Sequence, residues 1–347
     1  MSINDKPFRR LQSYAMSNDE ITLNYFPSAE CTDKGGTKAG SCAMGFGSCC
    51  IFTKDECSST IDQNNTYVRN DGFPTALTGA SISSCSFTIR KCDNEICRVR
   101  LDFESFTTLG PTGSLDGAAA GAGDCIDSFA ITGLSTGNSV VPTICGENMG
   151  QHMYFELGEA SGDTAMMAFT FGATAGSRSF EIRVTQYPCN SALTPPEGCL
   201  QWHTGTDGRF KTFNFDGDTV HLHNQDYNIC IRREEGMRCV QYQACSDDNS
   251  MTLFAKDATG GLADSVDCTL DFVTIEGSHD ATCSGILHNK YCGVKLNFED
   301  QPVNTIVCDC TAPFAVGIHT DAYVDGTDDT DNTVQSRGVC LEYNQIA

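Results

Sequence analysis

Hydrophobic and polar residues alternate with a period of two along most of this 347-residue chain. In the segment CRVRLDF, Cys97, Val99, Leu101 and Phe103 share one face, and the charged residues take the other. FEIRVTQY (180–187) and VCLEY (339–343) repeat the pattern, which is typical of half-buried β-strands. Few segments have helical periodicity, and glycine-rich turns such as GTDG (205–208) separate the strands. The sequence therefore predicts an all-β protein built from a pair of β-sandwiches.

A set of sequence elements occurs twice in the same order. CIDSF, ICGENMG and SFEIRVTQY in the first half correspond to CTLDF, YCGVKLNFE and RGVCLEYNQ in the second. A duplicated module explains this order, with the joint at the proline-rich segment 187–199. We expect a polar tail at 1–30, a small cap rich in cysteine and glycine at 31–56, and two modules at 57–188 and 189–347.

The chain contains 21 cysteines, which indicates an oxidising compartment and a disulfide framework. We expect a secreted, extracellular protein whose signal peptide was removed or lies upstream, since the opening residues lack an apolar core. No CxxC pair is present, which argues against zinc. The odd total leaves at least one cysteine that is free or joined to another chain. The cap has four cysteines, the first module six and the second eleven, so we expect the unpaired thiol in the second module.

The formal net charge of -23 argues against binding to nucleic acid or anionic lipid and favours cations such as calcium, or basic partners. No apolar run approaches the roughly 18 residues that a membrane helix requires. The chain also lacks HExxH and GxSxG motifs, and we do not expect an enzyme. His221 and His223 alternate in TVHLHNQ, where they form either two ligands of a metal site or a solvated strand face.

Several elements together resemble the CUB domain, an extracellular β-sandwich. They are the turn RNDGFP (69–74), the cysteines at 57, 85, 125 and 145, and the strings GSCAMGFGSCC, GCLQWHTGTDGRFKTFNF and ICIRREEG. The chain is similar to secreted two-CUB proteins that are abundant in arthropods, more clearly in the first module than in the second. The resemblance implies two CUB-like, jelly-roll-like antiparallel sandwiches behind a disulfide-stapled cap.

The resemblance also implies disulfide pairs, while the partners of the remaining second-module cysteines stay open. The implied pairs are Cys57–Cys85, Cys92–Cys97, Cys125–Cys145, Cys230–Cys239 and Cys268–Cys292. In the cap, two bridges are expected among Cys31, Cys42, Cys49 and Cys50, because so short a glycine-rich stretch cannot bury a core.

Many CUB domains hold a calcium ion between carboxylates, which are hard oxygen ligands. By this resemblance Asp271 in CTLDF and Asp321 in FAVGIHTDAY match two ligands in the second module, and Asp264 or Asp267 substitutes for an expected glutamate. The downstream stretch DAYVDGTDDTDN is either a cation site or a mobile acidic loop. The late loop of the first module, FTFGATAGSRSF, has no acid, so we expect no calcium there.

Asn64 begins an Asn-x-Thr sequon and is a candidate glycosylation site. Trp202, Tyr227 and Tyr242 are expected in the core rather than on a binding face. The favoured function is non-enzymatic recognition or adhesion, in which loops at the sandwich ends bind an extracellular protein or glycan. The alternative is a self-associating component of an extracellular matrix, coat or filament, linked through the odd cysteine and exposed sheet edges.

Overall fold

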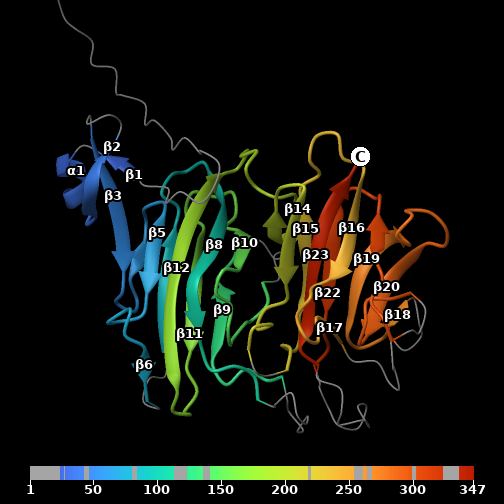
Figure 1. The fold of residues 1–347 in the computed structure, drawn as a ribbon. Helices are drawn as coiled ribbons and strands as arrows, with labels where there is room; N and C mark the ends of the chain where they lie inside the picture. The colour runs from blue at the N-terminus through green and yellow to red at the C-terminus, as the bar shows by residue number, and fades with distance from the viewer. Residues whose placement is uncertain are drawn as a thin grey trace, which may run out of the picture.

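The computed structural model describes residues 24–26, 28–42, 47–79, 84–112, 123–135, 141–217, 220–253, 261–263, 268–298, 302–322 and 336–347. These residues form β-strands and one short helix, α1 (Ser28–Asp33), so the predicted all-β fold is confirmed. Figure 1 shows two sandwiches side by side, with the N-terminal cap on the outer edge of the first. Among the described residues no helix has the length and hydrophobicity that a membrane crossing requires.

The first sandwich consists of a large and a small sheet. The large sheet has the order β1 (Asn24–Phe26), β3 (Gly47–Lys54), β5 (Thr66–Arg69), β12 (Ser177–Pro188), β8 (Ile96–Thr107), β10 (His152–Glu156), with β2 (Thr37–Cys42) beside β3 and β6 (Leu77–Thr78) beside β12. The small sheet has the order β4 (Thr60–Ile61), β7 (Ser84–Arg90), β11 (Thr164–Thr170), β9 (Ser128–Thr132). Phe169 of the small sheet stacks on Phe180 of the large one with ring centroids 4.1 Å apart, which joins the two layers.

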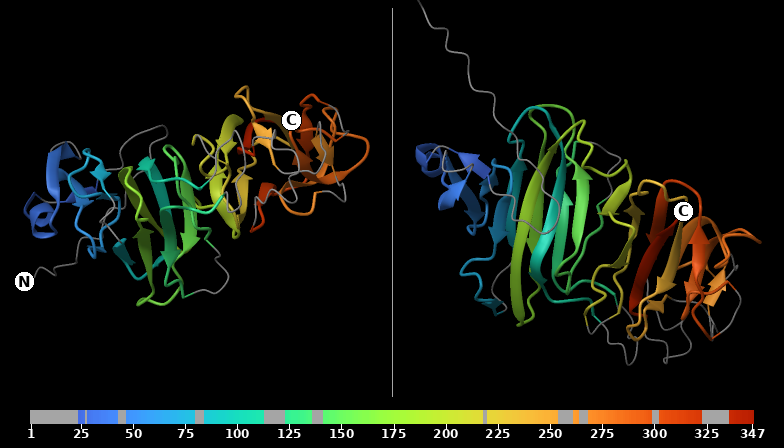
Figure 2. Two further views of the ribbon diagram at one scale, coloured as in Figure 1. Left: turned by 90° about the horizontal axis from the view of Figure 1, so that it is seen from below. Right: turned by 45° about the horizontal axis from the view of Figure 1, so that its top comes forward.

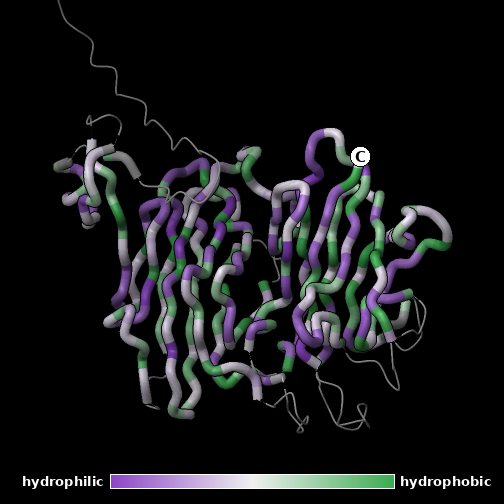
Figure 3. The backbone as a smooth tube through the Cα atoms, in the orientation of Figure 1, coloured by the Kyte–Doolittle hydropathy of each residue, from purple (hydrophilic) through white to green (hydrophobic). Residues whose placement is uncertain are grey.

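The predicted alternation holds along the strands, as the colouring of Figure 3 shows. On β8 Val99, Leu101 and Phe103 are buried, and on β23 (Gly338–Ile346) Val339, Leu341 and Tyr343 are buried. One face of each strand therefore supplies the core, as its sequence requires.

The cap is an extension of the large sheet rather than a separate layer. β1 and β2 both pair with β3, and β3 continues into the first sandwich by pairing in parallel with β5. A bridge from Cys31 to Cys50 closes the cap, and Cys49 is also disulfide-bonded. The side chain of Cys42 lies outside the described residues.

The second sandwich is one continuous sheet that folds over on itself. Its order is β13 (Cys199–His203), β15 (Asp226–Ile231), β22 (Phe314–His319), β19 (Phe272–His279), β21 (Val307–Asp309), β16 (Cys239–Ala244), β23, β14 (Asp207–Lys211), with β17 (Met251–Thr252) on β23, and β20 (His288–Gly293) joining β18 (Gly261–Ala263) to β19. The start of β19 pairs with β22 and its end pairs with β21, so β19 passes from one layer to the other. The ring of His203 on β13 lies 5.8 Å from that of Phe210 on β14, so the two ends of the path face each other.

Three of the disulfides expected from the resemblance are present, and two expected pairs are wrong. Cys57–Cys85, Cys125–Cys145 and Cys268–Cys292 form. Cys97 bonds to Cys189 instead of Cys92. The reason is the antiparallel pairing of β12 with β8, which sets Pro188 opposite Ile96 and so carries Cys189 to the start of β8.

Cys230 and Cys239 do not pair because their strands are not neighbours. β22, β19 and β21 lie between β15 and β16 in the sheet. Cys230 bonds instead to Cys199 on the adjacent β13, and Cys239 to Cys310, which follows the adjacent β21. The expected unpaired thiol in the second module is also wrong, because all eleven of its cysteines are bonded; the remaining bridges are Cys245–Cys340 and Cys283–Cys308.

The cores of the two sandwiches are continuous across the junction between them. Phe213 of the second half is buried against Phe103 of the first, with ring centroids 6.4 Å apart, and against Tyr227 of its own half at 5.4 Å. Figure 2 shows the halves in contact from two further directions. The junction therefore shares the hydrophobic stabilisation of the interior.

Replacing Phe213 with alanine should lower the free energy of unfolding by about 3–5 kcal/mol, because it leaves a cavity between both cores. Urea unfolding of the disulfide-intact chain measures this. Leu193→Ala, at a side chain that is 58% exposed, is the control and should change stability by less than about 0.5 kcal/mol. A Phe213→Ala effect as small as the control would contradict a shared core.

Candidate functional site

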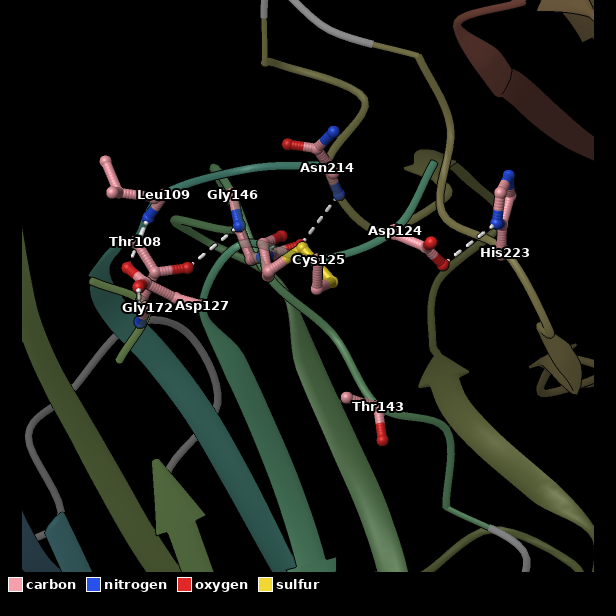
Figure 4. Close-up of a disulfide and its surroundings, with 12 residues drawn as sticks. Thr108, Leu109, Asp124, Cys125, Asp127, Thr143, Gly146, Gly172, Asn214 and His223 are labelled. Atoms are coloured by element: carbon pink, nitrogen blue, oxygen red, sulfur yellow. Dashed lines mark hydrogen bonds and ion pairs between the residues drawn. A yellow bond between two sulfur atoms is a disulfide. The ribbon is translucent and has the colours of Figure 1, made fainter. Parts of the chain in front are cut away.

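Each sandwich buries one aspartate directly before a strand. In the first, Asp127 precedes β9 and is fully buried. Its carboxylate accepts backbone N–H groups from Leu109 at 2.7 Å and Gly172 at 2.8 Å. The side chain of Arg178, also buried, completes the site with two charge-assisted bonds of 2.7 and 2.9 Å. Figure 4 shows Asp127 between Leu109 and Gly172.

The second sandwich repeats the backbone part of this arrangement. Asp271 precedes β19 and is 2% exposed. Its Oδ1 accepts the N–H of Asp321 at 3.0 Å. Asp321 lies two residues beyond the end of β22, just as Gly172 lies two residues beyond the end of β11. The structure thus brings together Asp271 and Asp321, the two residues that the sequence singled out.

The cation beside the carboxylate differs between the two sandwiches. At Asp271 the place of the guanidinium is taken by an imidazole, with Nε2 of His221 3.1 Å from Oδ2. Sequence reasoning missed both cations. The signal for Arg178 was a basic residue in the late loop of the first module, where the calcium-binding pattern has an acid. For His221 the signal in the sequence was its alternation with His223, which points to a different kind of site.

The His221–Asp271 pair shifts the pKa of both groups. Burial alone would lower the pKa of His221, but the Asp271 carboxylate outweighs burial and the pKa is raised. Burial alone would raise the pKa of Asp271, but the charge and hydrogen bond of His221 and the Asp321 N–H lower it. Each group therefore favours the charged form of the other, as in an ion pair.

The donor set around Asp271 fits calcium in chemistry, because the carboxylates of Asp271 and Asp321 are hard oxygen ligands on residues whose chain segments meet. His221 is the competing cation, since it occupies one oxygen of Asp271. Asp264, Asp267 and the acidic residues at 323–331 lie outside the described residues. In the first sandwich Arg178 pairs with Asp127, and the expectation of no calcium there stays a prediction.

His221 and His223 do not face a common point. Nδ1 of His221 lies 3.2 Å from the carbonyl oxygen of Leu222, and its Nε2 faces Asp271. His223 reaches the first sandwich, where its Nδ1 lies 3.5 Å from Asp124 (Figure 4). Their segment is not a strand, so the alternate spacing places them apart.

Other groups of ligand atoms among the described residues are disulfide sulfurs. Cys239, Cys283, Cys308 and Cys310 form one such group, and Cys245, Cys340 and Asp247 form another. Metal binding needs thiolates, which these disulfides do not offer. A hollow of about 470 Å³ over β14, β23 and β16 includes none of the Asp271 group in its lining.

The remaining candidates lie in the framework. Tyr227 and Tyr242 are buried, as expected for core residues, and Trp202 is half-buried at the junction. The side-chain amide of Asn64 exchanges two hydrogen bonds with the backbone of Gln186, at 2.9 and 2.7 Å. Its glycosylation stays a prediction.

Residues 196–346 match the family model of the animal CUB domain. The second half of the chain is therefore similar to an animal CUB domain. This half contains the Asp271 site, although the sequence resemblance was stated more strongly for the first half. CUB domains are typically extracellular and mediate protein interactions. No curated protein matches the chain in sequence.

Solved structures similar to the chain include the CUB1-EGF-CUB2 domains of rat MASP-1, at 14% identity and a TM-score of 0.25, covering 82% of this chain and 99% of that one. The corresponding human MASP-1/3 domains have 14% identity and a TM-score of 0.23, with coverage of 81% and 98%. The full extracellular region of zebrafish Gpr126/Adgrg6 has 14% identity and a TM-score of 0.27, with coverage of 82% and 36%.

The stabilisation from the His221–Asp271 pair should be lost both at high pH, where His221 loses its proton, and at low pH, where Asp271 gains one. The raised pKa of His221 makes its contribution complete below its ordinary value of about 6.5, and the contribution is lost as pH rises through the folded-state pKa. The lowered pKa of Asp271 makes its contribution complete above about pH 4, and that contribution is lost as pH falls through the folded-state value. Between these limits His221→Gln should cost about 3–5 kcal/mol, because it leaves a buried unpaired carboxylate.

Denaturant unfolding of the parent and His221→Gln at pH 6, 7.5 and 9 measures the difference. It should be largest at pH 6 and shrink toward pH 9. His288→Gln, on β20, is the control and should show no such trend. A difference that stays constant from pH 6 to pH 9 would show that His221 acts through packing and not through its charge.

Proposed function

We propose that the protein is a secreted, non-enzymatic recognition protein that binds a basic extracellular protein through the Asp271 end of its CUB domain, with calcium assisting. In this proposal the first sandwich is a second CUB domain that acts as scaffold. The net charge of -23 favours a partner rich in lysine and arginine. Loops at the end of a rigid sandwich suit recognition, because they vary without disturbing the core.

One observation carries the proposal. Asp271 is buried and preorganised by the Asp321 amide, yet its only described cationic partner is a histidine, whose charge is lost at moderately alkaline pH. The matching Asp127 holds an arginine, which keeps its charge at all ordinary pH values. Only the second site can therefore exchange its cation, and calcium is the divalent ion that suits carboxylates on separate loops.

Self-assembly through a second-module thiol has no support from the structure, because every cysteine there is bonded within the chain. Recognition is the better proposal. A non-catalytic role also agrees with the geometry of the Asp271 site, where both nitrogens of His221 face groups other than a nucleophile.

Calcium should bind the full chain more tightly at pH 8 than at pH 6, because binding at Asp271 competes with protonated His221. Isothermal titration with CaCl2, with MgCl2 for comparison, measures this. Asp271→Asn and Asp321→Asn should each weaken calcium binding at least tenfold, since each removes a carboxylate ligand. His221→Gln should remove the dependence on pH.

Asp226→Asn is the matched control, because it removes an exposed carboxylate from β15 of the same domain and should leave affinity unchanged. The absence of calcium binding in the parent would exclude calcium assistance. The amount of basic protein that the chain captures should differ between calcium and chelator, and between the parent and Asp271→Asn. No difference in either comparison would exclude this end of the domain as the binding surface.

A further inference from the structure

Two histidines meet where the sandwiches join. His152 on β10 belongs to the first half and His203 on β13 to the second, and their ring centroids lie 5.1 Å apart. The side chain of His152 is buried. Its Nε2 accepts the backbone N–H of Trp202 at 2.8 Å. An acceptor nitrogen must carry a lone pair, so His152 is neutral when the junction is closed.

Within the described part of the chain, the charged groups around the pair offer no free carboxylate. Arg100 on β8 lowers the pKa of both histidines, and its Nη1 donates to Tyr154 on β10. Asp102 lies opposite His152 in the β8–β10 register but is occupied by Arg100 at 2.6 Å and by Arg183 of β12 at 3.2 Å.

On the side of the second sandwich the neighbours of His203 are Phe210 of β14 and Tyr343 of β23, neither of them acidic. Nε2 of His203 is buried and has no hydrogen-bond partner within the described part of the chain. Further along the junction, His223 faces Asp124 and so has a carboxylate, unlike the other two. A proton on His152 or His203 would therefore bring an uncompensated charge into the junction.

The surrounding contacts are polar and can open. Gln201 donates to Gln151 at 3.1 Å, Gln151 donates to the carbonyl of Thr212 at 3.2 Å, and Gln225 donates to that of Thr143 at 3.1 Å. Amide side chains like these find water when a surface separates. β10 and β13 pair with other strands but not with each other, so no β-ladder would have to break.

We propose that the His152–His203 pair makes the junction between the two sandwiches acid-sensitive. Protonation of His152 replaces its acceptor with a second donor against the Trp202 N–H, and a proton on His203 adds repulsion from His152 and Arg100. β10 and β13 then separate, while the Cys97–Cys189 bridge, which joins β8 to the linker, keeps the halves tethered. The device changes how the two sandwiches are held, independently of calcium.

The direction with pH follows from the neutral closed state. Burial, Arg100 and the neighbouring histidine lower the pKa of His152 well below its ordinary value, and burial with Arg100 lowers that of His203 to about 4. The open junction therefore binds protons more readily than the closed one. The equilibrium constant for closing the junction is at its maximum above about pH 6.5. Below that pH each histidine lowers it by up to about tenfold per pH unit.

The chain has a single tryptophan, Trp202, whose amide is the donor to His152. Hydrogen exchange of that amide in the full chain, corrected for the intrinsic rate, should lose protection by about ten- to a hundredfold per pH unit between pH 6 and pH 5. Acrylamide quenching of its fluorescence should rise over the same range. The Met167 amide in β11 is the internal reference and should stay protected.

His152→Gln retains a side-chain acceptor for the Trp202 N–H but cannot be protonated, and His203→Gln removes the second titrating ring. The double variant should keep protection down to pH 5, and His203→Gln alone should halve the pH dependence on a logarithmic scale. His288→Gln on β20 should behave as the parent. Protection that does not change with pH in the parent, or the same loss in the His203→Gln and double variants, would overturn the proposal.

Discussion

A buried carboxylate at the end of each core sets the strictest condition in this protein. Asp127 and Asp271 are almost completely removed from solvent, and an uncompensated charge there would cost several kcal/mol. In both sandwiches a backbone N–H group offsets part of this cost by donating to the carboxylate, and in both it lies two residues beyond the end of a neighbouring strand. The rest must come from a cation, and the two halves use different ones. An arginine keeps its charge at any ordinary pH, whereas the charge of a histidine depends on pH.

The junction between the two sandwiches also buries polar groups, and most of them are neutral. Its centre is aromatic, around Phe103 and Phe213, and its margin consists of amides, histidines and backbone groups, with the carboxylate of Asp124 beside His223. Close approach depends on two glycines. A Cβ on Gly146 would lie 1.8 Å from Oδ1 of Asn214, and one on Gly123 would lie 1.9 Å from Nε2 of His223. Both glycines also have a positive φ, so a side chain there would be strained as well as crowded.

The sequence predicted what depends on periodicity and local motif. Alternation in segments such as CRVRLDF identified the strands and their buried faces, and the resemblance to the CUB domain anticipated that Asp271 and Asp321 meet. It could not predict what depends on strand order. Cys92–Cys97 and Cys230–Cys239 look like hairpin clips along the chain, but the register of β12 on β8 and the three strands between β15 and β16 assign the cysteines elsewhere. The roles of Arg178 and His221 were hidden for the same reason, since each reaches its aspartate through the fold and not through sequence proximity.

The two aspartate sites also differ in how much of the fold each one holds together. Where a duplicated module keeps a backbone amide, any side chain able to supply a positive charge can complete the site, so the cation is free to change while the strand geometry stays. Arg178, which pairs with Asp127, also donates to the carbonyls of Gly79, Gly172 and Thr174 and so ties three segments of the first sandwich together. A histidine at Asp271 makes fewer contacts among the described residues and can lose its proton, so the pairing of this second aspartate is the one that depends on pH.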